Sequence, residues 1–286
     1  MSPRTNAVRT GIQRGWTEFK QSVRSPQDQG FYIFMSVVIL IYLFFNRDNV
    51  VEGAGQSLSY PTVAMPSILG LIVAFGMIIG QAYTLAMERE DGTLLRAKAV
   101  PHGVLGQVTG YVVSNTLGII PSFAIVLIPG MLLFSGLMSN GLEGWFTVLW
   151  VTLLGILATL PIGMVIGSIV PGVQKVGTWG MLPFVILTAI SGIFFPIQAM
   201  WGWVQVVAQL FPLYWLGLGM RSAFLPDTAA ALEIDGSWRT GWTVLALSLW
   251  AVAGLAIAPV VLRRMARRQS GSQVEAAREQ ALQWVR

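Results

Sequence analysis

The 286-residue sequence contains no cysteine and a single histidine, His102. The absence of cysteine excludes disulfide bonds, thiolate metal sites and cysteine nucleophiles. Charge is also scarce, because only 11% of the residues are charged, against roughly 25% in soluble domains. So few charges cannot cover a surface that faces water. We therefore predict that most of the protein surface faces lipid.

Lysine is nearly absent as well. The three lysines are Lys20, Lys98 and Lys175, and none of them follows a glycine. The phosphate-binding loop G-x-x-x-x-G-K-[ST] therefore cannot occur. If ATP drives this protein, the nucleotide must be bound by another polypeptide.

Long charge-free stretches dominate what is present. An apolar run at 31–45 reaches, with its flanks, the ~20 residues that a bilayer requires. Five more apolar stretches follow at about 62–87, 104–137, 145–170, 178–197 and 241–262. The pattern predicts an all-α integral membrane protein with a six-span transmembrane domain at 31–262.

The first thirty residues are polar and basic but carry a helical apolar pattern. Apolar residues recur at steps of three and four, which places them on one helical face: Val8, Ile12, Trp16, Phe19 and Val23. The pattern predicts an amphipathic helix in the lipid headgroup plane, ended by Ser25-Pro26. A solvated basic tail is the alternative.

The positive charges predict the topology. With six spans, all but three of the 18 Lys and Arg residues fall on one side; Arg47, Arg221 and Arg239 fall on the other. The positive-inside bias then places both termini in the cytoplasm, with 263–286 as a basic cytoplasmic tail and the chain in the inner or plasma membrane. Because the cations follow topology in this way, the net charge of +5 does not indicate nucleic acid binding.

The segment 198–226 is ambiguous. Residues 202–220 are uncharged and long enough to cross, but a seventh crossing would move the arginines of the C-terminal tail outside. We predict instead a re-entrant element that enters from the outside, breaks at Pro212 and lines a cavity or gate. A loop at the membrane surface is the alternative. The predicted outer-gate residues are Pro196, Trp201, Trp203, Pro212, Tyr214 and Trp215.

Ionisable residues are almost missing from the predicted spans between 104 and 262. Proton and ion relays need such residues, so a proton-coupled carrier, an ion pump and a charged-filter channel are disfavoured. No hydroxyl has a base in its own span, which disfavours an enzyme. The polar groups that remain can bond between helices or, with phenylalanines, line a path for an apolar or amphipathic molecule. The candidates are Phe75, Gln81, Phe184, Thr188, Ser191, Phe194 and Phe195.

Glycine pairs spaced four apart occur at 11/15, 76/80, 106/110 and 163/167. With 31 glycines in 286 residues, chance alone gives about three such pairs. The spacing is therefore weak evidence of close helix contacts.

The densest charge cluster, Glu88-Arg89-Glu90-Asp91-Gly92-Thr93, ends the second apolar stretch. A short helix is predicted over 93–101, capped by Thr93 and ended by Pro101, with Gly92 in the preceding turn. Its side chains would face a partner or the membrane interface: Leu94, Leu95, Arg96 and Lys98. A solvated loop is the alternative.

These residues carry a family resemblance. Segment 88–101, EREDGTLLRAKAVP, resembles the E-R-E-x-G-T-L-x-x-L signature of type-2 ABC exporter permeases, the group that includes daunorubicin-resistance-type drug exporters. Segments 191–196 (SGIFFP) and 211–213 (FPL) are similar to the S-G-x-x-F-P … N-P-L pattern near the fifth span of that family. The chain departs at Phe211, where Asn is common, and at 97–101, where a Leu/Ala-Thr-Pro run is frequent.

The resemblance implies a division of labour between chains. The helix at 93–101 would be a coupling helix seated on a separate ATP-binding subunit, present in two copies, that binds ATP and Mg. This chain would bind no cofactor and have no ATPase site. A second permease, identical or a sister chain, would complete the path. The implied coupling interface comprises Glu88, Arg89, Glu90, Gly92, Thr93, Leu94, Leu95, Arg96 and Lys98.

The resulting hypothesis is a permease subunit that exports a drug, natural product or lipid by alternating access. Three alternatives remain at this point. One is a secondary transporter or channel without an ATPase, and another is a permease for polysaccharide or lipid-linked glycan. The third is a membrane scaffold or enzyme subunit that transports nothing.

Overall fold

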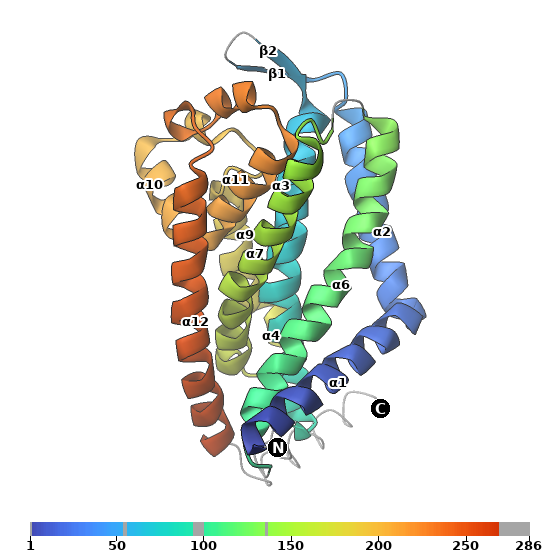
Figure 1. The fold of residues 1–286 in the computed structure, drawn as a ribbon, viewed down its shortest axis with the longest axis vertical. Coiled ribbons are helices and arrows are strands. Elements are labelled where there is room, and N and C mark those ends of the chain that lie inside the picture. The colour runs from blue at the N-terminus through green and yellow to red at the C-terminus, as the bar shows by residue number, and fades with distance from the viewer. Residues whose placement is uncertain (1, 54–55, 94–99, 135–136, 269–286) are drawn as a thin grey trace.

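The computed structural model describes residues 2–53, 56–93, 100–134 and 137–268, which form a tall bundle of helices (Figure 1). We call its two ends the hairpin end, which carries β1 and β2, and the Glu88 end, where α1 lies. The elements are α1 (Pro3–Arg24), α2 (Pro26–Phe45), β1 (Val50–Gly53), β2 (Gln56–Ser59), α3 (Tyr60–Phe75), the π-helix η1 (Gly76–Gly80), α4 (Gln81–Glu90), α6 (Gly103–Leu133), α7 (Gly141–Ile169), α8 (Val173–Lys175), the π-helix η2 (Val176–Gly180), α9 (Met181–Ile190), α10 (Gly202–Leu210), α11 (Pro212–Phe224) and α12 (Thr240–Arg268), with short 3-10 turns at Ile197–Ala199 (η3), Asp227–Leu232 (η4) and Ile234–Gly236 (η5).

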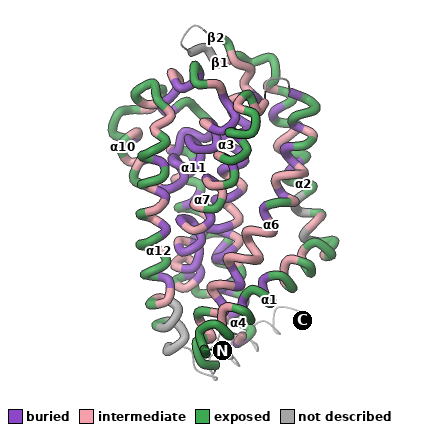
Figure 2. The backbone as a smooth tube through the Cα atoms, viewed as in Figure 1, coloured by how far each residue is buried: buried purple, intermediate pink, exposed green. Residues whose placement is uncertain are grey.

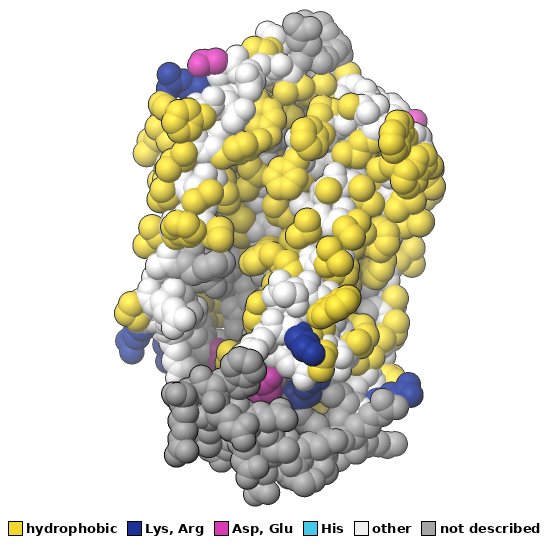
Figure 3. All heavy atoms as spheres, turned by 180° about the vertical axis from the view of Figure 1, so that it is seen from behind, with side chains coloured by type: hydrophobic (Ala, Val, Ile, Leu, Met, Phe, Trp, Pro, Cys, Tyr) yellow, Lys and Arg dark blue, Asp and Glu magenta, His cyan; other side chains and the backbone are white. Residues whose placement is uncertain are grey.

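The all-α prediction is confirmed. Among the described residues, five helical runs are long and apolar enough to cross a bilayer: Tyr60–Glu90, Gly103–Leu133, Gly141–Ile169, Val173–Ile190 and Thr240–Val261. The apolar part of α2, Ile33–Phe45, is shorter, and its crossing stays a prediction. Hydrophobic side chains cover the middle of the bundle, and the visible charges lie toward its ends (Figure 3).

The centre of the bundle is formed by α3, α7 and α11, whereas α2, α10 and α12 lie outside and are largely exposed (Figure 2). Every residue of α11 from Pro212 to Arg221 is buried. The bundle differs from a soluble domain in its exposed surface, because the outer helices are themselves apolar. The exposed face therefore suits lipid rather than water.

The break in the segment 198–226 is also confirmed. Helices α10 and α11 meet at Phe211 with a bend of 92°. Proline fixes φ and cannot donate a backbone hydrogen bond, so Pro212 begins α11 rather than continuing α10. The sequence did not predict the antiparallel hairpin of β1 and β2, which joins α2 to α3.

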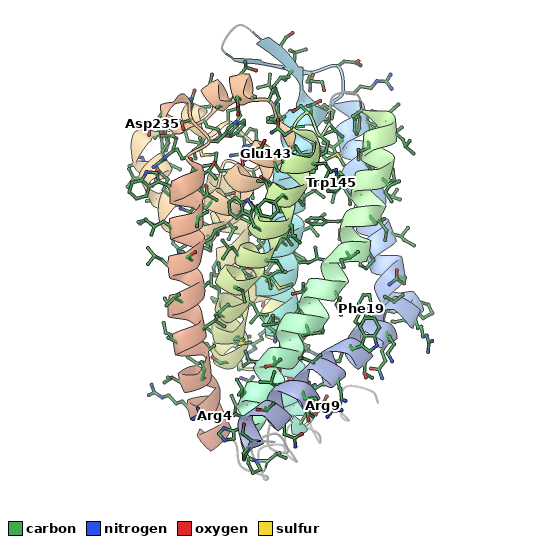
Figure 4. The ribbon with its side chains drawn as sticks, in the orientation of Figure 1. Arg4, Arg9, Phe19, Glu143, Trp145 and Asp235 are labelled. Atoms are coloured by element: carbon green, nitrogen blue, oxygen red, sulfur yellow. The ribbon has the colours of Figure 1, made fainter. Side chains whose placement is uncertain are left out.

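The predicted N-terminal helix exists and ends at Arg24, before Ser25-Pro26. Its predicted apolar face is available to lipid, since Ile12, Trp16 and Val23 are 44–49% exposed. The basic residues Arg4 and Arg9 lie along the same helix (Figure 4). Its location in the headgroup plane stays a prediction.

The glycine spacing was judged weak evidence of close helix contacts, and this interpretation was wrong for three of the four pairs. Gly11 and Gly15 are buried where α1 crosses α6 at Gly106 and Gly110. A Cβ atom added to Gly11 would lie 2.3 Å from the Gly106 carbonyl oxygen. In the same way, Gly163 and Gly167 bring α7 against η1 and α4. Chance statistics failed here because they ignore which helices meet.

Candidate functional site

Glu88 lies in the last turn of the long helical run α3–η1–α4 and is only 8% exposed. It is followed directly by Arg89 and Glu90. Successive side chains on an α-helix point about 100° apart. Three consecutive charged residues therefore reach three different neighbours.

Glu88 accepts hydrogen bonds from two other helices. Its Oε2 accepts from the Tyr111 hydroxyl and the Gln107 amide of α6, and its Oε1 accepts from the Arg14 guanidinium of α1. The Gln107 amide also donates to the Tyr111 hydroxyl at 2.8 Å. A buried carboxylate is stable only when it is paired and hydrogen-bonded in this way.

Arg14 connects the same site to α1. Its Nε donates to Glu18 Oε1 at 2.6 Å, and its guanidinium lies 5.7 Å from the centre of the Tyr111 ring. Burial opposes the charged form, but the carboxylates of Glu88 and Glu18 outweigh it and hold the pKa of Arg14 above its usual value. The guanidinium therefore stays charged and bound to Glu88.

Arg89 and Glu90 contact the ends of two further helices. Arg89 Nη2 donates to the Val170 carbonyl at 2.6 Å, and its Nη1 to the Ser168 carbonyl at 3.3 Å. These carbonyls lie at the C-terminus of α7, where a cation is favoured. Glu90 Oε1 accepts from the Val173 amide at 2.9 Å, at the start of α8.

One short segment of α4 thus holds α1, α6, α7 and α8 together at one end of the bundle. We call this set of residues the Glu88 joint: Arg14, Glu18, Glu88, Arg89, Glu90, Gln107 and Tyr111. Sequence reasoning identified the three α4 residues but missed the partners. One available signal was that Arg14 lies between Gly11 and Gly15 on a single helical face.

The predicted coupling helix begins at this joint. Gly92 has φ +71°, a left-handed conformation that glycine adopts without strain. The turn predicted there is confirmed. Thr93 follows it in helical conformation, whereas Leu94, Leu95, Arg96 and Lys98 lie outside the described residues.

The predicted substrate-path residues do not form one group. Phe75 and Phe184 meet edge to face, with ring centres 5.6 Å apart. Gln81 accepts from Asn115 Nδ2 of α6 at 3.0 Å. Thr188 and Ser191 donate to carbonyls of their own helical segment, namely Phe184 and Thr188. Phe194 and Phe195 lie at the hairpin end, beside a pocket.

The predicted gate residues divide into two layers. The rings of Trp201 and Trp203 stack with centres 6.0 Å apart and are 74% and 64% exposed, and Pro196 is also exposed. Pro212, Tyr214 and Trp215 are instead buried in the bundle. The indole of Trp215 donates to the Gln209 carbonyl at 2.7 Å, across the bend between α10 and α11.

The comparisons with known proteins identify the family of the chain but do not address the site residues. No curated protein matches the sequence. Residues 8–225 match the family model described as "ABC-2 type transporter", and the match extends from α1 through the bent pair α10–α11. The chain is a multi-pass membrane protein, and the matched region covers well over half of its sequence. It therefore belongs to the ABC-2 type transporter family, as a membrane permease without an ATPase site of its own.

Proposed function

We propose that this permease exports a hydrophobic or amphipathic molecule, driven by a separate ATP-binding subunit that acts through the Glu88 joint. ABC-2 permeases in general pair with ATP-binding subunits. The observation that carries the proposal is the buried Glu88 carboxylate, which ties α1 and α6 to the helix that leads into segment 93–101.

A joint of this kind can transmit force. Movement of segment 93–101 by a bound ATPase would act first on the end of α4. Because Glu88, Arg89 and Glu90 fix that end to four other helices, the helices would move with it. The run α3–η1–α4 then continues toward the hairpin end, and along the way Gly70 of α3 lies against Leu216 of α11. ATP binding at one end would thereby shift the packing of the predicted gate.

The apolar character of the bundle supports the proposed cargo class. Its spans carry aromatic and aliphatic side chains, with the Phe75–Phe184 pair between the second and fifth predicted spans. These surfaces suit a drug, natural product or lipid more than an ion. A second permease, identical or a sister chain, would complete the path. The daunorubicin-resistance-type subgroup and outward transport rest on the resemblance at 88–101 and 191–196.

The first test concerns sidedness, because an ATPase can act only on the cytoplasmic face. The chain has no cysteine, so a single introduced thiol reports its own location. Asp91 at the Glu88 end and Ser57 in β2 are both exposed. We expect a membrane-impermeant maleimide to label Ser57→Cys in intact cells and Asp91→Cys only after the cells are opened. Labelling of Asp91→Cys in intact cells would disprove the coupling proposal.

The second test concerns the motor. A tagged permease purified from its native host in mild detergent is expected to retain a chain with a phosphate-binding loop, and ATP depletion is expected to stop transport. The matched control is a permease that lacks segment 94–99, which should lose the ATP-binding chain but still insert. Unchanged transport without ATP would instead favour a secondary transporter.

A further inference from the structure

A second buried ion pair lies at the hairpin end. Arg221 near the end of α11 and Glu233 in the following loop are 3% and 4% exposed, and Arg221 Nε lies 2.5 Å from Glu233 Oε1. Six-span charge counting assigned Arg221 to the outside with Arg47 and Arg239. That sidedness stays a prediction. The structure adds that Arg221 is buried within the protein at the hairpin end, paired with a carboxylate that compensates the cost of burial.

The guanidinium also reaches two other segments. Arg221 Nη1 donates to the Ser67 hydroxyl of α3 at 2.8 Å and to the Gly192 carbonyl, in the turn after α9, at 3.3 Å. Gly217 leaves room for this, since a Cβ atom there would lie 3.2 Å from Nη1. One side chain therefore holds α11 to α3 and to the SGIFFP segment.

Glu233 is itself fixed to the surrounding loops. Its carbonyl accepts from Gln198 Nε2 at 2.5 Å, and its amide donates to the Ala230 carbonyl at 2.9 Å. Its second carboxylate oxygen, Oε2, is buried and receives no hydrogen bond from the described protein groups. Arg221 and Glu233 both line the pocket at the hairpin end, together with Tyr60 and Phe194.

We propose that Arg221 and Glu233 form a latch and that opening of the hairpin end requires this latch to release. Arg221 holds α11 of the bent pair directly to α3 and to the turn after α9, and Glu233 binds Arg221 to the loop that follows α11. The proposal rests on the proposed function only in treating this end as the gate. Its physical reason is that a guanidinium makes several directed bonds at once, and that separating it from its carboxylate while both stay buried is costly. Water entering the pocket from the hairpin end would lower that cost, so release and opening are linked.

The test uses the cysteine-free chain in detergent or nanodiscs without ATP. Ala64 lines the pocket and is 5% exposed, so the Ala64→Cys thiol reports opening of the latch. We expect Glu233→Gln to raise its rate of labelling by a soluble thiol reagent at least tenfold. Exchanging the charges, Arg221→Glu with Glu233→Arg, is expected to restore part of the protection.

Two controls separate a latch from general loosening. Ala86 at the Glu88 end is fully buried, and labelling of Ala86→Cys should not change with Glu233→Gln. Asp235 is an exposed acid on the same loop (Figure 4), and Asp235→Asn should leave labelling of Ala64→Cys unchanged. Acceleration at both thiols would mean a structural role only.

Unchanged labelling of Ala64→Cys in Glu233→Gln would overturn the latch. If that variant does not fold, Arg221→Lys provides the same test, because lysine keeps the charge but cannot make the three directed bonds together. Equal protection in Arg221→Lys and the parent would likewise overturn it. None of these measurements uses ATP, so a failed latch is distinguishable from a failed exporter assignment.

Discussion

Replacing Glu88 by glutamine is expected to uncouple ATP hydrolysis from transport while the protein still inserts into the membrane. The change removes the negative charge that Arg14, Gln107 and Tyr111 all contact. Breaking a buried ion pair from one side costs about 3 kcal/mol; we take the low end of the range because Arg14 is partly exposed and keeps Glu18. We expect transport to fall at least tenfold while ATPase activity persists, measured with the partner subunit in vesicles. Arg89→Ala is expected to act in the same direction.

A matched control distinguishes coupling from stability. Glu143 is an exposed acid on α7 at the opposite end of the bundle (Figure 4). We expect Glu143→Gln to change neither the coupling of ATP hydrolysis to transport nor the thermal stability. The double variant Arg14→Met with Glu88→Met replaces the ion pair by apolar groups, which is often nearly neutral for stability. We expect this double variant to regain thermal stability but not the coupling of ATP hydrolysis to transport. Normal transport in Glu88→Gln would contradict the role of the joint.

Substituting Gly163 by alanine is expected to destabilise the bundle strongly. A Cβ atom there would lie 2.3 Å from the Met77 carbonyl oxygen and 2.6 Å from that of Ile78. These are backbone atoms of η1, so no side-chain rotation relieves the overlap and α7 must move away from the run α3–η1–α4. Overpacking costs 1–3 kcal/mol or more, and we expect about 3 kcal/mol here. Thermal unfolding in detergent measures it.

Gly118 is the control for this substitution. It also lies inside a long helix, α6, but an added Cβ atom would meet no atom within 4 Å. Alanine has the higher helix propensity by roughly 0.5–1 kcal/mol, so Gly118→Ala should be neutral or slightly stabilising. Equal effects of the two substitutions would show that α7 and η1 do not pack as closely as described.

Two hydrogen-bonded centres, one toward each end of the long run α3–η1–α4, connect this run to several of the other helices. The Glu88 joint fixes α1, α6, α7 and α8, and the Arg221 contacts fix α11, the Glu233 loop and the turn after α9. Between them the run contains a π-helix at Gly76–Gly80. Such insertions loosen the regular hydrogen-bond ladder of a helix. The run α3–η1–α4 is thus the element that reaches both centres.

Much of the fold could be predicted because the relevant signals are local. The apolar stretches reflect the thickness of the bilayer. Pro26 and Pro212 restrict the backbone and so mark where helices end or begin, and Gly92 permits the positive φ of a turn. The three acidic and basic residues at 88–90 were found because charge is conspicuous next to a membrane span. Helix ends differed by a few residues, as at α7, which begins at Gly141 rather than near 145.

The partners of those charges could not be predicted. Arg14 is 74 residues from Glu88 in the sequence, and Arg221 is 154 residues from Ser67. Nothing in the local sequence distinguishes a cation that faces water from one that meets a distant carboxylate. The glycine pairs failed for the same reason, because a small residue matters only where another helix lies against it.

The sequence by itself determined that this is a helical membrane protein without a nucleotide-binding loop, whose broken segment lies before the last span. These properties depend on composition and on residues close together in the chain. The tertiary structure alone decided that Glu88 is the centre of a joint, that Arg221 is buried and that α1 packs on α6 through glycine. The physical reason is that burial, pairing and close packing arise between helices, and lipid-facing helices give no hydrophobic periodicity that identifies their neighbours.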